Sequence, residues 1–279
     1  MKRLRHAAPA LVLALGSTAI AQDAAPKIAD CRAALIAETP TARPGTELSV
    51  GVRLVLAPGR HVYWKYPGDS GAAPVVDWKL PEGWVAGPIA WPTPHRLVQD
   101  GLVSYVYEGE VLLPVSLQVP AGAAAGDAIL GATVHWVACS DEACTSGSDA
   151  CQARVEIRED PPVADPAHAA AFAAARASLP KELPAGAATL EEFSGGIVLV
   201  VKGLEGSSAE FFPSDPLTLD ETRPAVFDPT SPVALRIRLF PAPRRKEPVT
   251  RLRGVLVVHL DGSTASWTID ATTPERPPR

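Results

Sequence analysis

Methionine, cysteine and histidine are all scarce in this sequence of 279 residues. The single methionine is Met1, which excludes a copper(I) site built from methionine side chains. The six histidines are scattered and form no triad-like grouping with carboxylates, so hydrolase chemistry is not favoured. The sequence has no low-complexity segment and no glycine pattern typical of nucleotide binding.

Long uncharged apolar runs are also lacking, and no stretch is long enough to span a bilayer. Residues 1–21 instead have the three parts of a secretory signal: a basic start, an apolar run over residues 7–15 and a small-x-small cleavage pattern at residues 19–21. We therefore expect an exported protein that begins near Gln22, lies outside the cytoplasm and carries no membrane anchor.

Positive charge is in short supply. Removal of residues 1–21 takes away three of the 26 basic residues and none of the 31 acidic ones, which leaves 23 against 31 and a net charge of −8. This balance argues against nucleic acid or anionic lipid as a partner. The one basic cluster, residues 244–246, lies among prolines and is interpreted as a solvated loop.

The sequence does contain runs in which apolar and other residues alternate. Apolar residues occupy the even positions of residues 48–56 and again of residues 128–138, which is the period of half-buried strands. In the second run Trp136 should face the core, and the outward face should carry His135 and an accessible Cys139. Proline- and glycine-rich turns separate these runs, so mostly antiparallel β structure is predicted.

Between two strand-rich halves lies a segment with helix signals. Asp165 is a candidate N-cap and Pro166 a suitable first helical residue, and an alanine-rich run extends to Ser178. Prolines at 180 and 184 should end the helix. We expect a linker over residues 159–185.

The four cysteines divide by spacing into a near pair, Cys139 and Cys144, and a distant pair, Cys31 and Cys151. A chain-entropy estimate gives about 2 kcal/mol for closing the near loop and about 5 kcal/mol for the distant one. Cys31–Cys151 is therefore the candidate structural disulfide, and the near pair is freer to exchange.

Acidic residues lie between the two near cysteines, with no Lys or Arg within the same ring to oppose them. Their negative charge disfavours a thiolate, which suits handover between docked partners better than broad oxidation of the Cys-x-x-Cys kind. A metal site formed by Cys139, Cys144, Cys151 and His135 is the alternative chemistry, but the spacing matches no common zinc motif. No metal and no cofactor is expected.

Several motifs resemble one family, the amino-terminal periplasmic domain of DsbD-like reductases, and in particular that of the ScsB proteins linked to copper tolerance. The first half carries tryptophan- and proline-rich motifs, and the second half carries shorter ones. These motifs are YWKYPGDSG at 63–71, WKLPEGW at 78–84, WPTP at 91–94, WVAC at 136–139 before the second cysteine at 144, and matches at 179–180, 211–213 and 254–257.

The resemblance implies an immunoglobulin-like β-sandwich in which Cys139 and Cys144 are the redox pair. Cys144 would form mixed disulfides, and a cap loop would shield the pair. That loop comprises Val98, Gln99, Asp100, Gly101 and Leu102. In the family the pair takes electrons from a membrane-embedded domain and passes them to periplasmic disulfide proteins. This chain lacks the family's transmembrane and thioredoxin-like segments, so a separate protein is expected to donate the electrons.

These observations predict an all-β protein of two immunoglobulin-like β-sandwich domains, residues 22–158 and 186–279, joined by a short helical linker. The favoured function is periplasmic thiol–disulfide interchange of the protein-disulfide reductase type, with thiol–disulfide proteins as partners. The alternative is a non-catalytic periplasmic binding module with structural disulfides, related to copper tolerance. The sequence does not name the partner or the direction of electron flow.

Overall fold

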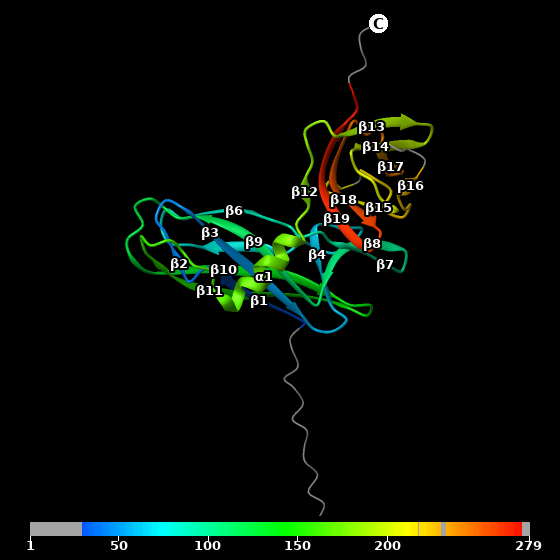
Figure 1. The fold of residues 1–279 in the computed structure, drawn as a ribbon. Helices are drawn as coiled ribbons and strands as arrows, with labels where there is room; N and C mark the ends of the chain where they lie inside the picture. The colour runs from blue at the N-terminus through cyan, green and yellow to red at the C-terminus, as the bar shows by residue number, and fades with distance from the viewer. Residues whose placement is uncertain (1–29, 217, 230–232, 275–279) are drawn as a thin grey trace, which may run out of the picture.

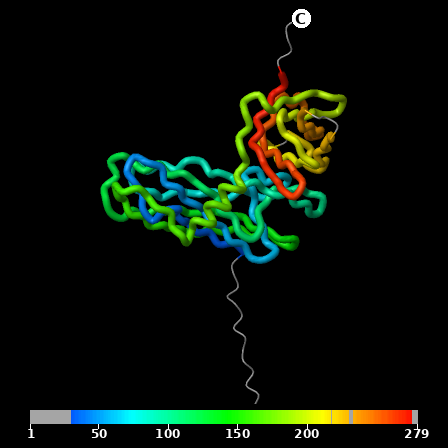
Figure 2. The backbone as a smooth tube through the Cα atoms, in the orientation of Figure 1, coloured from blue at the N-terminus to red at the C-terminus, as the bar shows by residue number. Residues whose placement is uncertain are grey.

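The computed structural model describes residues 30–216, 218–229 and 233–274. The predicted signal sequence lies outside these residues. The described chain is almost entirely β structure, with one helix between two groups of strands (Figure 1, Figure 2). This arrangement confirms the predicted fold class of two immunoglobulin-like β-sandwich domains with a helix between them.

The first domain packs two sheets against each other. One sheet has the order β1-β3-β9-β6 and the other the order β2-β11-β10-β4-β8-β7, with β5 pairing β10. The strands of the first sheet are β1 Cys31–Ala37, β3 Glu47–Leu56, β9 Glu110–Gln118 and β6 Val85–Ile89. Those of the second are β2 Thr41–Ala42, β11 Cys144–Ile157, β10 Gly126–Cys139, β4 His61–Gly68, β8 Leu102–Glu108, β7 His95–Gln99 and β5 Val75–Lys79.

The apolar side chains of the alternating runs fill the core of this domain. In β3 the five even residues from Leu48 to Leu56 are all buried. In β10 Trp136 faces the core as predicted, and its indole N–H donates to Asp149 at 3.0 Å. Because alternate strand residues point to opposite faces, His135 and Cys139 then lie on the outer face of the sheet.

Helix α1 Pro166–Ala177 confirms the predicted N-cap and first helical residue. The Asp165 carboxylate accepts from the Ala167 N–H at 2.9 Å, Pro166 opens the helix, and Ser178 ends it. The helix is held to the first domain by Phe172 and Ala175, which are buried against Leu112. Its docking fixes where the chain enters the second domain.

The strands of the second domain form one hydrogen-bonded sheet with the order β15-β18-β19-β13-β14-β17-β16, with β12 pairing β19. Strands from both ends of this order, β15 and β17, contribute to one buried cluster, so the sheet folds over itself as a sandwich. A tight turn at Asp261 and Gly262, a residue pair typical of hairpin turns, joins β18 to β19. β12 lies inside the segment expected to be linker. The strands are β12 Lys181–Glu182, β13 Ala188–Phe193, β14 Gly196–Lys202, β15 Ser208–Pro213, β16 Val226–Asp228, β17 Ala234–Leu239, β18 Arg251–Leu260 and β19 Ser263–Thr272.

The two domains share an apolar contact. Phe212, Val255 and Val257, from β15 and β18, belong to the same buried cluster as the core of the first domain. A hydrogen bond of 2.6 Å between the Thr93 and Ser266 hydroxyls adds a polar tie. The second domain consequently lies at the end of the first domain that carries β4, β7 and β8 (Figure 1).

Candidate functional site

A disulfide joins Cys139 to Cys144 where β10 turns into β11. The two residues are direct partners in the antiparallel register, with their Cα atoms 4.0 Å apart. Their environments differ sharply: Cys139 is only 2% exposed, whereas Cys144 is exposed. The outward direction predicted for Cys139 is correct, but the predicted accessibility is wrong because other side chains cover that face.

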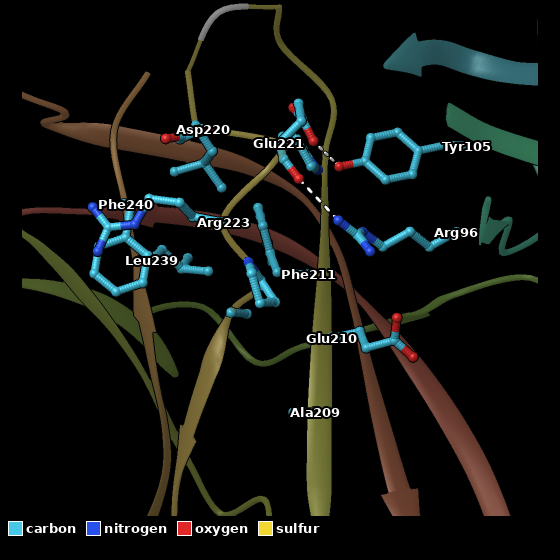
Figure 3. Close-up of a pocket in the computed structure, with 14 residues that line it drawn as sticks. Arg96, Tyr105, Ala209, Glu210, Phe211, Asp220, Glu221, Arg223, Leu239 and Phe240 are labelled. Carbon is cyan, nitrogen blue, oxygen red and sulfur yellow. Dashed lines mark hydrogen bonds between the residues drawn. The ribbon is translucent and has the colours of Figure 1, made fainter. Parts of the chain in front are cut away.

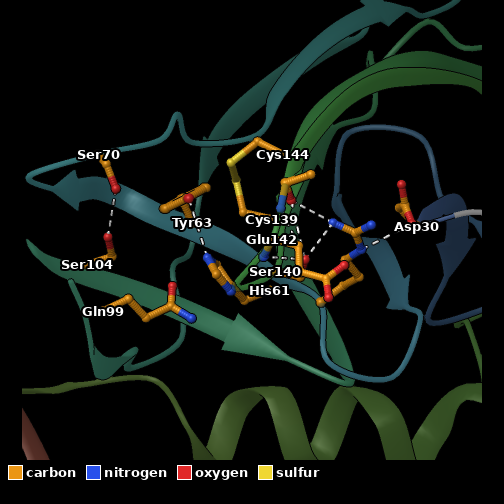
Figure 4. Close-up of a disulfide and its surroundings, with 12 residues drawn as sticks. Asp30, His61, Tyr63, Ser70, Gln99, Ser104, Cys139, Ser140, Glu142 and Cys144 are labelled. Carbon is orange, nitrogen blue, oxygen red and sulfur yellow. Dashed lines mark hydrogen bonds and ion pairs between the residues drawn. A yellow bond between two sulfur atoms is a disulfide. The ribbon is translucent and has the colours of Figure 1, made fainter.

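The cover over Cys139 is made by its neighbours on the outer face of the sheet. Tyr63 of β4 and Val106 of β8 pack with Cys139 in one buried cluster, and Leu97 and Val137 pack against it. Figure 4 shows the Tyr63 ring beside the disulfide. We call these four side chains the Cys139 cover. They leave Cys144 as the half of the disulfide that another protein can approach.

A loop after β4 holds the cover in place. Asp69 accepts from the Val103 N–H through its carboxylate at 2.8 Å and donates its own N–H to the Val103 carbonyl at 2.8 Å. The Ser70 and Ser104 hydroxyls are 3.1 Å apart. The next residue, Gly71, has a φ of 88° and sits so close to the Tyr63 ring that a Cβ atom there would overlap it.

Replacing Gly71 with alanine should therefore push Tyr63 away from Cys139. We expect the free energy of unfolding to fall by about 1–3 kcal/mol and the disulfide to be reduced faster by dithiothreitol. Gly262→Ala is the matched control, because it has a φ of 79° and open space where the Cβ would lie. Equal reduction rates for the two variants would show that Gly71 does not support the cover.

The predicted cap loop is the tip of the hairpin formed by β7 and β8. Asp100 and Gly101, with φ values of 50° and 79°, make its two-residue turn, and the Gln99 amide donates to the Asp141 carboxylate between the cysteines. Val98 and Leu102 are 53% and 49% exposed, and neither belongs to the apolar cluster that buries Cys139. On the same hairpin, Leu97 and Val106 are the side chains that belong to the Cys139 cover.

A positive charge lies beside the acidic segment between the cysteines. The Arg60 guanidinium donates to the Ala143 carbonyl at 2.6 Å and to the Ser140 hydroxyl at 3.1 Å. It also pairs with Asp30 at 3.1 Å. No Lys or Arg lies between the two cysteines in sequence, but Arg60 brings a positive charge to this segment from the turn before β4.

His61 lies directly opposite Cys139 in the register between β4 and β10. Its ring is buried, and its Nε2 atom is 3.3 Å from the Tyr63 hydroxyl. Burial lowers the pKa of His61, which keeps the imidazole neutral near pH 7. A neutral imidazole can accept a proton from a thiol.

Cys31 and Cys151 are not bonded to each other; both are buried free thiols. The expected structural disulfide is therefore absent, since the Cys151 thiol is directed to the Ala33 carbonyl at 3.3 Å. Burial, helped by Asp149, raises the pKa of Cys31 to about 12 and also raises that of Cys151. Protonated thiols are poor nucleophiles, so neither residue competes with the near pair for exchange.

The four residues considered for a metal site are not brought together. Cys139 and Cys144 are bonded to each other, Cys151 pairs with Ala132 far along the ladder, and His135 lies 3.0 Å from Asp77. Within residues 30–216, 218–229 and 233–274, no three His, Cys, Asp or Glu side chains are grouped to hold a metal ion. The chemistry that the site offers is thiol–disulfide exchange.

The comparisons with known proteins agree with this site. Residues 32–154 match the family model described as "Thiol:disulfide interchange protein DsbD, N-terminal". The first domain is a DsbD-like N-terminal domain. Both halves of the disulfide lie inside the matched residues of this domain, which belongs to a thiol–disulfide interchange family.

One solved structure resembles the chain over both domains. The N-terminal periplasmic domain of ScsB from Proteus mirabilis aligns with a TM-score of 0.61 at 16% identity, over 90% of this chain and 97% of that one. This likeness extends the shared fold beyond the DsbD-like domain. Spo0M of Bacillus subtilis aligns over 87% of this chain and 91% of its own at 12% identity, but its TM-score of 0.23 is too low to support a shared fold. No curated protein matches the sequence.

No helix in the part of the chain that the structure describes has the length and apolar character needed to cross a bilayer.

Sequence reasoning missed the three residues that surround the disulfide from the start of β4, namely Arg60, His61 and Tyr63. The motif that begins at Tyr63 is visible in the sequence only as a family signature. What places these residues at the disulfide is the pairing of His61 with Cys139 across 78 positions of sequence, 139 against 61, which no local pattern reports.

Proposed function

We propose that this protein is a periplasmic thiol–disulfide interchange protein that relays electrons between partner proteins through Cys139 and Cys144. The observation that carries the proposal is the unequal burial of the two cysteines, one covered and one exposed. An inert staple needs no such asymmetry, whereas exchange needs one sulfur open to attack and the other held back for the resolving step.

The reaction balances without a cofactor. A partner thiolate attacks the Cys144 sulfur, a new disulfide forms between partner and Cys144, and the Cys139–Cys144 bond breaks with its electron pair on Cys139. A second partner thiolate then attacks the partner sulfur of the mixed disulfide and releases Cys144. The partner is oxidised to a disulfide and the pair is reduced to two thiols, which pass their electrons on by the reverse steps.

The surrounding residues fit these roles. Arg60, bonded to the Ala143 carbonyl, places positive charge beside the segment that bears Cys144. Neutral His61, opposite Cys139, is suited to take the proton of the Cys139 thiol when that thiol attacks and to return it when Cys139 leaves. Both would favour the thiolate, the form that reacts.

Partners of the proposed relay are periplasmic thiol–disulfide proteins, with a membrane-embedded protein as the electron source. A shallow depression that begins at Ser146, two residues after Cys144, offers them a docking surface. Its lining includes small and apolar side chains, among them the exposed Val75. The residues that line it are Ala72, Ala73, Val75, His135, Trp136, Val137, Ser146, Gly147 and Ser148.

A measured reduction potential tests the proposal. Equilibration of the Cys139–Cys144 pair with glutathione buffers should give a potential above about −300 mV, the upper bound for inert structural disulfides. Cys31→Ala and Cys151→Ala in the same chain remove the two free thiols from the readout. A potential well below that bound would favour the alternative, a binding module in which the near disulfide is only a staple.

A further inference from the structure

The hairpin of β7 and β8 has two faces with different partners. Leu97 and Val106, on one face, belong to the Cys139 cover. Arg96 and Tyr105 are direct partners in the register and lie on the opposite face. That opposite face is turned toward the second domain, where the Tyr105 ring lies 5.2 Å from the ring of Phe212 in a T-shaped contact.

One residue of the second domain holds both side chains on that face. The Tyr105 hydroxyl donates to the Glu221 carboxylate, and the Arg96 guanidinium donates to the Glu221 backbone carbonyl at 2.9 Å. Figure 3 shows the two side chains converging on Glu221, which lies in the segment between β15 and β16. The second domain is thus tied to the hairpin whose other face covers Cys139.

We propose that Glu221 is a positioning residue for the redox site: by holding Arg96 and Tyr105, it keeps the hairpin closed and Leu97 seated over Cys139. The second domain then restrains the redox site in the first, although it contributes no cysteine. This inference rests on the proposed function for its purpose, but the contact itself is testable without any exchange partner.

The electrostatics of the contact make the restraint depend on pH. Burial, helped by the charge of Asp69, raises the pKa of Glu221 to about 7 from its usual 4.5. The groups that face this carboxyl from the first domain are Asp69 of the loop after β4, Tyr66 of β4, Arg96 of β7 and Tyr105 of β8; from the second domain, Glu210, Asp220 and Arg223 line the same pocket.

The stability of the closed contact depends on pH because its formation changes the pKa of Glu221. Because the closed contact raises the pKa of Glu221, it favours the protonated carboxyl, and opening the contact to water favours the carboxylate. The closed form is therefore most stable below pH 4.5 and loses this contribution as the pH rises through about 7. Glu221→Gln keeps the shape without the charge, so it should remain closed across this range.

Alkylation of Cys139 reports the restraint directly. In the full chain with Cys144→Ser, Cys139 is a buried free thiol, and iodoacetamide reaches it only when the cover lifts. The alkylation rate is measured in this variant and in the same variant with Glu221→Gln added. We expect the first rate divided by the second to rise about tenfold between pH 6 and pH 8. The ionisation of the Cys139 thiol and of the reagent cancels in this ratio.

Peptide mapping supplies the controls. Tyr105→Phe should speed alkylation of Cys139 at pH 6. Tyr107→Phe is the control on the same strand: it loses a hydrogen bond to the Pro92 carbonyl and should not speed alkylation. Cys31 and Cys151 are buried elsewhere in the same domain and report general loosening. A flat ratio across pH, or parallel acceleration at Cys31 and Cys151, would overturn the proposal.

The two proposals fail separately. If Glu221 does not restrain the hairpin, the alkylation ratio stays flat while exchange with protein partners continues. If the relay is wrong, protein partners do not exchange with the pair, yet the alkylation ratio still rises with pH.

Discussion

Replacing Cys144 with serine is expected to reduce protein disulfide exchange to the rate seen without the protein. The exposed sulfur is then missing, and the remaining thiol of Cys139 lies under Tyr63 and Leu97, where an incoming protein cannot reach it. The measurement is the reduction of an oxidised thioredoxin-like protein by the reduced chain, followed by gel shift. Persistence of exchange would place the reactive sulfur elsewhere.

The opposite variant, Cys139→Ser, should behave differently. Cys144 remains exposed but has no partner to resolve a mixed disulfide, so adducts with thiol–disulfide proteins should accumulate instead of turning over. The two variants remove the same disulfide and therefore lose similar stability. A difference between them measures the chemistry of the two sulfurs and not the loss of the bridge. Identical behaviour would argue for a staple.

Phe172→Ala is expected to cause the largest loss of stability outside the core of either sandwich. Phe172 is fully buried where α1 packs on Leu112, and its removal leaves a cavity that should lower the free energy of unfolding by about 3–5 kcal/mol. Chemical denaturation measures this. Val163→Ala, at a site 76% exposed just before the helix, should cost less than about 0.5 kcal/mol.

The loss of helix packing in Phe172→Ala should also weaken the junction between the two domains. The end of the helix is tied to the first domain by the Thr93 N–H, which donates to the Ser178 carbonyl at 2.8 Å. If the helix detaches, the second domain loses this anchor. A Phe172→Ala variant as stable as Val163→Ala would show that the helix is not docked as the structure has it.

The sequence predicts well wherever the determinant is local. The N-cap of α1 at Asp165 directly precedes the helix that it begins, and the alternation in β3 and β10 reports directly which residues face the core. The turn at Gly262 is equally local. The near cysteine pair could be singled out for the same reason, since both sulfurs belong to one hairpin.

The sequence predicts poorly where a residue's surroundings come from parts of the chain that are distant in sequence. Alternation gives the face on which Cys139 lies, but it does not show that Tyr63 and Leu97 cover that face. Chain entropy favours a long-range bridge for Cys151, but it takes no account of the Ala33 carbonyl that its thiol contacts. The tie between Arg96 and Glu221 spans 125 positions and carries no sequence signature.

The most direct test of the account is to identify the cysteine that a partner captures. The oxidised chain is mixed with a reduced thioredoxin-like protein that lacks its own resolving cysteine, so the mixed disulfide persists and can be mapped by mass spectrometry. The account predicts a single adduct at Cys144, with Cys31 and Cys151 unmodified and the sandwich still folded. An adduct at Cys139, or no adduct while the Cys139–Cys144 bridge stays intact, would contradict it.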